Sequence, residues 1–266
     1  MENIATKLTY LNETKTEIKA QLETQVGTTF ESDLRTFLRI MNLLGNVTLT
    51  SIPIRAFEGC GYNEDTGEVG LQAISIPSSV TIISEYAFSQ CTSLSLVTIS
   101  DGVETIKSGA FQACTQLPEI TLPDSVTTIN DHIFSGCSNL TAVSLSNNIA
   151  TIPQDAFHDC TSLTAISIPD NVTTVETEAF LNCSGLTTLQ LSENIETLGE
   201  DVFKNCNHLS RITCLATAPP TVDQNWHGLD NTNNCPIYVP AAATVTYRST
   251  SGWSNYATRI RAIPEP

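Results

Sequence analysis

The sequence predicts a repeat solenoid, mainly β with short helical turns, that is preceded by an α-helical N-terminal segment. Three observations lead to this prediction: a strict 23-residue period, an apolar alternation inside each period, and a separate helical pattern before the first period. A fixed period of this length is typical of architectures in which short units stack on one another.

The period is marked by a Phe-x-x-Cys motif. The regular pairs are Phe88/Cys91, Phe111/Cys114, Phe134/Cys137, Phe157/Cys160, Phe180/Cys183 and Phe203/Cys206. An earlier pair, Phe57 and Cys60, lies 31 residues before the next, so the first unit contains an eight-residue insertion, which we place at 61–68. The array therefore has seven units.

Each unit is expected to contain two short strands and an arc. Apolar and polar residues alternate after each cysteine, as at Ile166 and Ile168, with the period of a β-strand. A turn rich in Pro, Asp and Asn follows, then a second apolar pair such as Val172 and Val175, and then a short helical turn or an irregular arc before the next phenylalanine. Because such a unit is too small to bury its own apolar side chains, we predict a stacked solenoid over residues 47–215.

The repeat resembles the BspA-type, or Treponema-type, leucine-rich repeat, as the segment 168–186 illustrates. Residues 216–266, with Ala-Pro-Pro-Thr at 218–221 and aromatic residues near 253–256, resemble the ending that closes these arrays in bacterial surface proteins. The resemblance implies a degenerate last repeat and a cap. A cap is also required physically, because the last coil would otherwise expose a strand edge and an apolar face.

Residues 1–46 form a third part, predicted to be helical. One amphipathic stripe consists of Ile4, Leu8, Leu11, Lys15, Ile18 and Leu22. The helices of this segment either cover the first coil or associate with copies of themselves as a short parallel coiled coil. In the second case we expect a homo-oligomer and favour a trimer. The segment 7–19 is also similar to an N-terminal module of bacteriophage tail, baseplate and fibre proteins, and this resemblance implies attachment to other virion proteins.

Charge limits the partners. The chain has 12 Lys and Arg against 28 Asp and Glu, a formal net charge of -16, which is the wrong sign for binding nucleic acid. No apolar stretch approaches the ~20 residues that a membrane-spanning helix needs, and Glu2 stands where a signal peptide carries positive charge. We therefore predict no nucleic-acid partner, no membrane insertion and no export signal.

Signatures of catalysis are missing from the sequence. It lacks a His-Glu-x-x-His motif, a Gly-rich phosphate loop and a Gly-x-Ser-x-Gly elbow, so we predict that the protein is not an enzyme and uses no cofactor. The four histidines occupy different positions of the period and cannot form a ladder, and we predict no metal site. The cysteines are expected to be buried thiols, with the redox state of Cys214 and Cys235 left open.

Two regions are candidates for binding. One is the outward face of the main strands, where Glu119, Gln190 and Arg211 depart from a row of small residues. The other is the C-terminal end, which contains Trp226, Tyr238, Tyr247, Trp253 and Tyr256. For each region a purely structural role, as a regular sheet or as cap packing, is the competing interpretation.

Together these features favour a non-enzymatic bacteriophage virion protein, a tail, baseplate or fibre component located in the virion. Its N-terminal helices would contact other virion proteins, and its solenoid would contact a host-surface protein or glycan or a neighbouring virion protein. The alternative is a bacterial leucine-rich repeat adhesin that is secreted or held at the cell surface.

Overall fold

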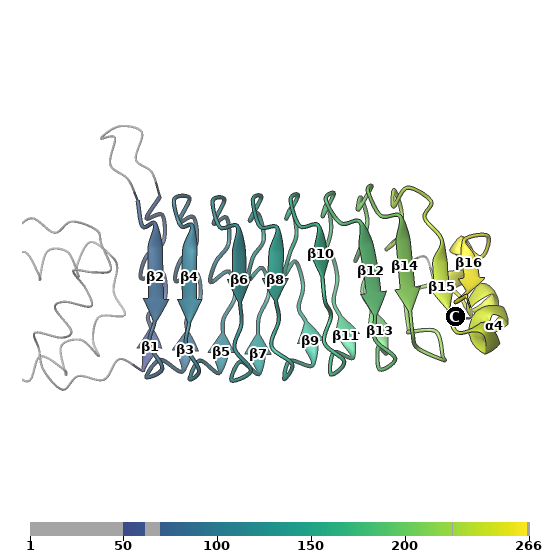
Figure 1. Ribbon diagram of the computed structural model, residues 1–266, viewed down its shortest axis with the longest axis horizontal. Helices are drawn as coiled ribbons and strands as arrows, with labels where there is room; N and C mark the ends of the chain where they lie inside the picture. The colour runs from purple at the N-terminus through teal and green to yellow at the C-terminus, as the bar shows by residue number, and fades with distance from the viewer. Residues whose placement is uncertain (1–49, 62–69, 225, 265–266) are drawn as a thin grey trace, which may run out of the picture.

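The computed structural model describes residues 50–61, 70–224 and 226–264. These residues form an elongated β-solenoid whose coils follow one another along the long axis, and the C-terminal segment closes one end (Figure 1). The repeat solenoid is thus confirmed. The predicted helical segment 1–46, with its stripe from Ile4 to Leu22, lies outside the described residues.

The main strands form one row of parallel pairs along the solenoid (Figure 1). They are β2 (Ala73–Ile76), β4 (Leu96–Ile99), β6 (Glu119–Thr121), β8 (Ala142–Ser144), β10 (Ala165–Ile166), β12 (Thr188–Leu191), β14 (Arg211–Cys214), β15 (Ile237–Val239) and β16 (Ile260–Ala262). Within the repeats, partners are one period apart: Glu119 lies opposite Ala142, and Thr188 lies opposite Arg211. Alternate residues point into the core, and the others form the outward face predicted from the alternation.

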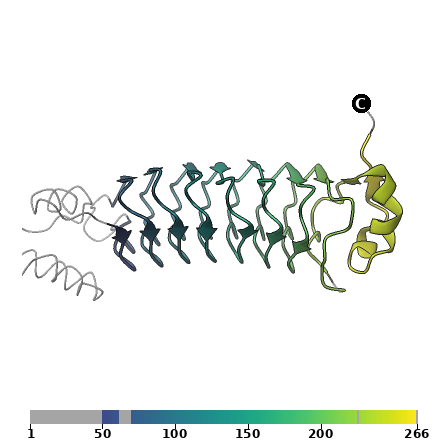
Figure 2. The same ribbon diagram turned by 90° about the horizontal axis from the view of Figure 1, so that it is seen from below.

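A second row of short strands lies on another side of each coil, as Figure 2 shows. These two-residue strands are β1 (Ser51–Ile52), β3 (Ile82–Ile83), β5 (Thr105–Ile106), β7 (Thr128–Ile129), β9 (Thr151–Ile152), β11 (Thr174–Val175) and β13 (Thr197–Leu198). Parallel pairing links β1, β3, β5 and β7, and likewise β9, β11 and β13. The second residue of each strand is buried, so both rows contribute to one continuous core.

Of the two alternatives for the segment between the second strand and the phenylalanine, the structure has the irregular arc and not the short helical turn. Around Phe88, the amides of Ala87 and Ser89 donate to carbonyls three residues back in the same coil. The amides of Tyr86, Phe88 and Gln90 donate instead to carbonyls of the next coil. Tyr86 and Gln90 have φ values of 56° and 59°, and a residue in this left-handed region cannot continue a right-handed helix. The arc is therefore a run of turns that also pairs laterally.

The phenylalanines form one continuous stack in the core. Neighbouring ring centroids are separated by 5.1 to 5.8 Å, and the rings are nearly parallel. The rings belong to Phe57, Phe88, Phe111, Phe134, Phe157, Phe180 and Phe203. Because each ring covers its two neighbours, the repeated motif supplies the apolar contacts between successive coils.

All nine cysteines lie in the described residues, and they are buried and form no disulfide. In the repeats the thiol donates to the carbonyl of the phenylalanine one coil earlier, at 3.0 Å for Cys91 and Phe57 and at 3.3 Å for Cys206 and Phe180. Burial raises the pKa of Cys206 to about 12. The prediction of buried thiols is confirmed, and Cys214 and Cys235 are unlinked.

Residues after the last regular unit continue the main sheet before closing it. Strand β15 pairs with β14, and β16 pairs with β15. The segments η1 (Ala241–Ala243), α4 (Thr244–Ser249) and η2 (Trp253–Tyr256) lie between β15 and β16 in the chain. None of the helices in the described residues has the length and apolarity to cross a membrane. The division at residue 215 stays a prediction, since the sheet runs through it.

Candidate binding surface

Four of the five aromatic residues predicted at the C-terminal end are buried in the cap. Trp226, Tyr247 and Trp253 are at most 1% exposed, and Tyr256 is also buried. The Trp226 and Trp253 rings lie 5.0 Å apart, with Tyr247 edge-on to Trp253 at the same distance. These side chains are therefore packed inside the cap, in agreement with the competing interpretation of cap packing.

The polar atoms of these aromatic side chains are also occupied. Trp226 Nε1 donates to the carbonyl of Gly199 at 2.8 Å, and Trp253 Nε1 donates to the carbonyl of Pro220 at 2.9 Å. The Tyr247 hydroxyl donates to the carbonyl of Ala216 at 3.0 Å, and burial raises its pKa far above the ordinary range. Each ring thus ties the cap to the last coils.

Tyr238 is different, because it lies half-buried on the outward side of β15. The strand register places Thr213 of β14 opposite Tyr238, and Arg261 of β16 on its other side. Gln190 of β12 lies opposite Thr213. Residues on four successive strands thereby form one row at the C-terminal end of the outward face.

Arg211 joins this row by lying over the tyrosine. Its guanidinium carbon is 4.4 Å from the centroid of the Tyr238 ring, and its Nε donates to the Thr213 hydroxyl at 3.1 Å. A cation held over an aromatic face with one donor already engaged has a restricted orientation. We call the set Gln190, Arg211, Tyr238 and Arg261 the terminal patch.

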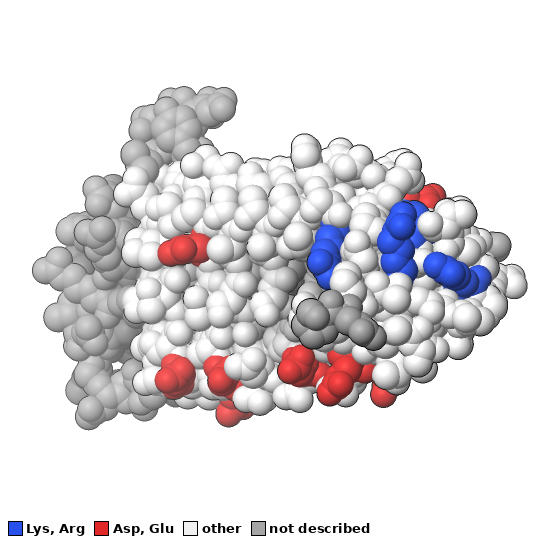
Figure 3. All heavy atoms as spheres, turned by 45° about the vertical axis from the view of Figure 1, so that its right-hand side comes forward, with Lys and Arg blue, Asp and Glu red and all other residues white. Residues whose placement is uncertain are grey.

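The terminal patch is basic in a strongly acidic chain. In Figure 3, Lys and Arg side chains gather toward the C-terminal end, and most Asp and Glu side chains follow the lower edge. Glu119 lies on β6, separated from β12 by β8 and β10, so it does not belong to the patch. The structure thus brings together Gln190, Arg211 and Tyr238, which the sequence had placed in two regions.

Arg261 was missed by the sequence analysis, although a signal for it exists. Ile237 pairs with Ile260, and Tyr238 pairs with Arg261, each one 23-residue period apart. The period is lost between β14 and β15, where Ile212 pairs with Ile237, 25 residues further along the chain. The return of the period in the C-terminal segment could have identified β16 and its outward arginine.

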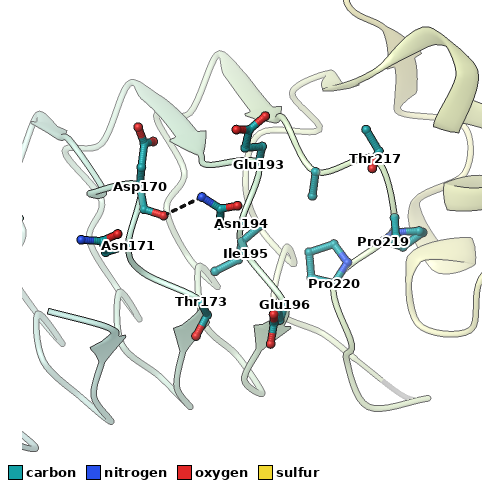
Figure 4. Close-up of a pocket in the computed structure, with 12 residues that line it drawn as sticks. Asp170, Asn171, Thr173, Glu193, Asn194, Ile195, Glu196, Thr217, Pro219 and Pro220 are labelled. Carbon is teal, nitrogen blue, oxygen red and sulfur yellow. Dashed lines mark hydrogen bonds between the residues drawn. The ribbon is translucent and has the colours of Figure 1, made fainter. Parts of the chain in front are cut away.

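A separate hollow of about 530 Å³ lies where the last turns meet the segment 216–220 (Figure 4). Asp170, Glu193 and Glu196 line it, and Asn194 Nδ2 donates to the Asp170 carbonyl at 3.1 Å. The same bond recurs one coil earlier, from Asn171 to Asn147. The asparagines of the hollow therefore belong to the hydrogen bonds that hold successive turns together.

Comparison with known proteins identifies the repeat. A family profile described as "BspA type Leucine rich repeat region (6 copies)" matches residues 66–184 and 131–223. The chain belongs to this family. The resemblance inferred from the 23-residue motif is confirmed, whereas the comparisons give no support to the phage-module resemblance of the N-terminal segment. A search of the curated proteins found no match.

Similar solenoids are present among the solved structures. A leucine-rich cell surface protein from Faecalibacterium prausnitzii is 25% identical, with a TM-score of 0.54 over 75% of this chain and 65% of that one. The T. pallidum leucine-rich repeat protein is 25% identical, with a TM-score of 0.51 over 69% of this chain and 78% of that one.

A Bacteroides ovatus leucine-rich repeat protein, 23% identical with a TM-score of 0.50, shares the fold over 71% of this chain and 58% of its own. This chain spans less than two thirds of the length of the Faecalibacterium and Bacteroides structures.

Proposed function

We propose that the chain is a non-enzymatic bacterial leucine-rich repeat adhesin, secreted or held at the cell surface. Membership of the BspA-type family supports this function, as does the likeness to a Faecalibacterium protein described as a leucine-rich cell surface protein. Regular repeats suit this role because a stacked solenoid presents an extended outward sheet on which a few side chains determine what binds.

The terminal patch is the docking site in this proposal, and an acidic host glycan is its partner. Arginine has a planar fork of donors that pairs with carboxylate and sulfate groups. Tyr238 and Thr213 hold the Arg211 fork, and Arg261 adds a second exposed guanidinium on the same row. The local positive charge of this patch supports an anionic partner, and the net charge of -16, which repels anions elsewhere on the surface, confines docking to the patch.

The bacteriophage interpretation takes second place. It depended on the N-terminal segment, which lies outside the described residues, and the comparisons name bacterial proteins. Oligomerisation, with a trimer favoured, stays a prediction that light scattering on the purified chain can test.

Binding of a sulfated heparin oligosaccharide to the purified chain tests the docking site. We expect the double variant Arg211→Ala/Arg261→Ala to bind at least tenfold more weakly, since two charged hydrogen-bonding groups are lost. Binding should also weaken as salt is raised. Lys107→Ala is the matched control, because Lys107 pairs with Glu85 on a different part of the solenoid.

Two outcomes would count against the proposal. Equal affinity of the double variant and the unmodified chain would exclude the terminal patch. Equal binding of a neutral glucan of the same length would exclude recognition through charge.

A further inference from the structure

A cluster of histidine and carboxylate side chains lies on the arcs in the middle of the solenoid. The residue two positions before each phenylalanine forms a column, and adjacent coils contribute His132, Asp155 and Glu178 to it. His158 follows Phe157 by one residue and turns back toward Asp155 of its own coil. Three successive coils therefore bring two imidazoles and two carboxylates together.

Asp155 is the centre of this cluster. Its side chain is only 6% exposed, and its two oxygens face different histidines. His158 Nδ1 lies 3.0 Å from Oδ1, and His132 Nδ1 lies 3.5 Å from Oδ2. Gln154 Nε2 also donates to Oδ2 at 3.1 Å. The carboxylate is thus held in a fixed position by neighbours on both sides.

Glu178 completes the cluster from the following coil. One potential ligand atom from each of Asp155, His158 and Glu178 lies within 4.8 Å of the other two. Partial burial and the nearby charge of Asp155 raise the pKa of Glu178. Two carboxyl groups that repel each other beside two imidazoles make a site in which a bound cation would offset the repulsion.

We propose that Asp155, His158 and Glu178 bind one divalent cation of the zinc class. Mixed imidazole and carboxylate ligands suit zinc and its neighbours, whereas calcium and magnesium prefer oxygen alone. Ligand bonds of about 2.0 to 2.2 Å require the side chains to close on the ion, and binding displaces any proton that a ligand atom holds. The bound cation links two successive coils, and His132 of the preceding coil faces Asp155.

This site joins positions of different phase in the repeat, so a comparison of equal phases in the sequence does not reveal it. His132 lies two residues before its phenylalanine, and His158 lies one residue after the next. Both face Asp155: His132 from the preceding coil, and His158 from the same arc three residues further along the chain.

The experiment is calorimetric titration of ZnCl₂ into the full chain after chelator treatment, in a buffer that does not bind metal. We expect one Zn²⁺ per chain and a thermal midpoint that rises on binding. Glu178→Gln and His158→Gln should each lower the affinity at least tenfold. His208→Gln is the matched control, because His208 lies outside the cluster, with Nδ1 2.6 Å from the Ser184 carbonyl.

Several results would overturn the proposal. One is the absence of a binding heat for Zn²⁺, and another is unchanged affinity in a Glu178→Gln variant whose circular dichroism matches that of the unmodified chain. Ca²⁺ binding as tight as Zn²⁺ binding would identify the cluster as an acidic surface without zinc selectivity. A loss of affinity in His208→Gln equal to that in His158→Gln would place the ion elsewhere.

Discussion

The solenoid core and the C-terminal cap both bury aromatic rings, but they arrange them differently. In the solenoid, successive phenylalanines are nearly parallel, with interplanar angles from 4° to 23°. In the cap, Trp226 meets Trp253 at 48° and Tyr256 at 89°. A repeated coil offers each ring an identical neighbour, whereas the last coil has no successor and needs a closure made of individual contacts.

Polar groups show the same difference. In the solenoid one thiol-to-carbonyl bond is copied from coil to coil, as from Cys137 to Phe111 and from Cys183 to Phe157. In the cap each donor has a partner of its own, such as Arg259 Nε with the Cys235 carbonyl. A perturbation common to all coils should therefore act on the solenoid many times, whereas a perturbation of the cap should act only once.

Alkaline pH is expected to have the largest effect, because it acts on several buried thiols whose pKa is raised. Burial raises the pKa of Cys183, and a hydrogen bond to Cys137 together with burial raises that of Cys114. The pKa of Cys206 rises from 9.0 to about 12. Above pH 9 the unfolded chain loses protons that the folded chain retains, so the free energy of unfolding falls, by about 1.4 kcal/mol per pH unit for each thiol.

Urea unfolding at pH 8, 9, 10 and 11 measures this loss. Below pH 9 these thiols are protonated in both states and contribute no pH dependence. Cys183→Ala should reduce the pH dependence of the free energy of unfolding above pH 9 by the contribution of one thiol. The cap tyrosines, whose pKa values are also raised from 10.0, should add a further loss of stability only above about pH 10. A constant free energy of unfolding from pH 8 to 11 would contradict the prediction.

A single break in the phenylalanine stack should have the next largest effect. Phe134→Ala removes a fully buried ring that lies 5.8 Å from Phe111 and 5.5 Å from Phe157. We expect a loss of about 3 to 5 kcal/mol in the free energy of unfolding, from urea denaturation. Phe57→Ala should cost less, because this ring is 8% exposed whereas Phe134 is fully buried. Equal losses would mean that this difference in burial has no effect.

The regular part of the fold could be predicted because stacking fixes the register. Residues one period apart must lie on adjacent coils, so the spacing of Phe134 and Phe157 alone predicts that Glu119 lies beside Ala142. The conformation of the arc could not be predicted. Its left-handed positions hold Tyr86, His132 and Asp155, which carry no glycine signal, and their φ values follow from lateral pairing with the next coil.

The candidate site was only partly predictable for a related reason. Alternation within β12 and β14 is enough to place Gln190 and Arg211 outward. A count of aromatic residues cannot distinguish Tyr238 on the surface from Trp253 in the cap, because burial there depends on irregular contacts between segments distant in sequence. Periodicity predicts what is repeated, and the terminal patch forms where repetition ends.

The smallest expected effect is the loss of one hydroxyl from the cap. Tyr247→Phe keeps the buried ring but removes the group that donates to the Ala216 carbonyl and lies 3.2 Å from Cys214 Sγ. We expect a loss of about 1 to 2 kcal/mol in the free energy of unfolding, since a buried acceptor loses its donor. Tyr238→Phe, on a half-buried ring, is the control and should change stability less.

Hydrogen exchange should localise the Tyr247→Phe effect to β14–β16, because the hydroxyl joins the cap to the last coil. Faster exchange spread evenly from β2 to β16 would show that cap and solenoid unfold as a single unit, and the contrast between them would then be one of packing geometry alone.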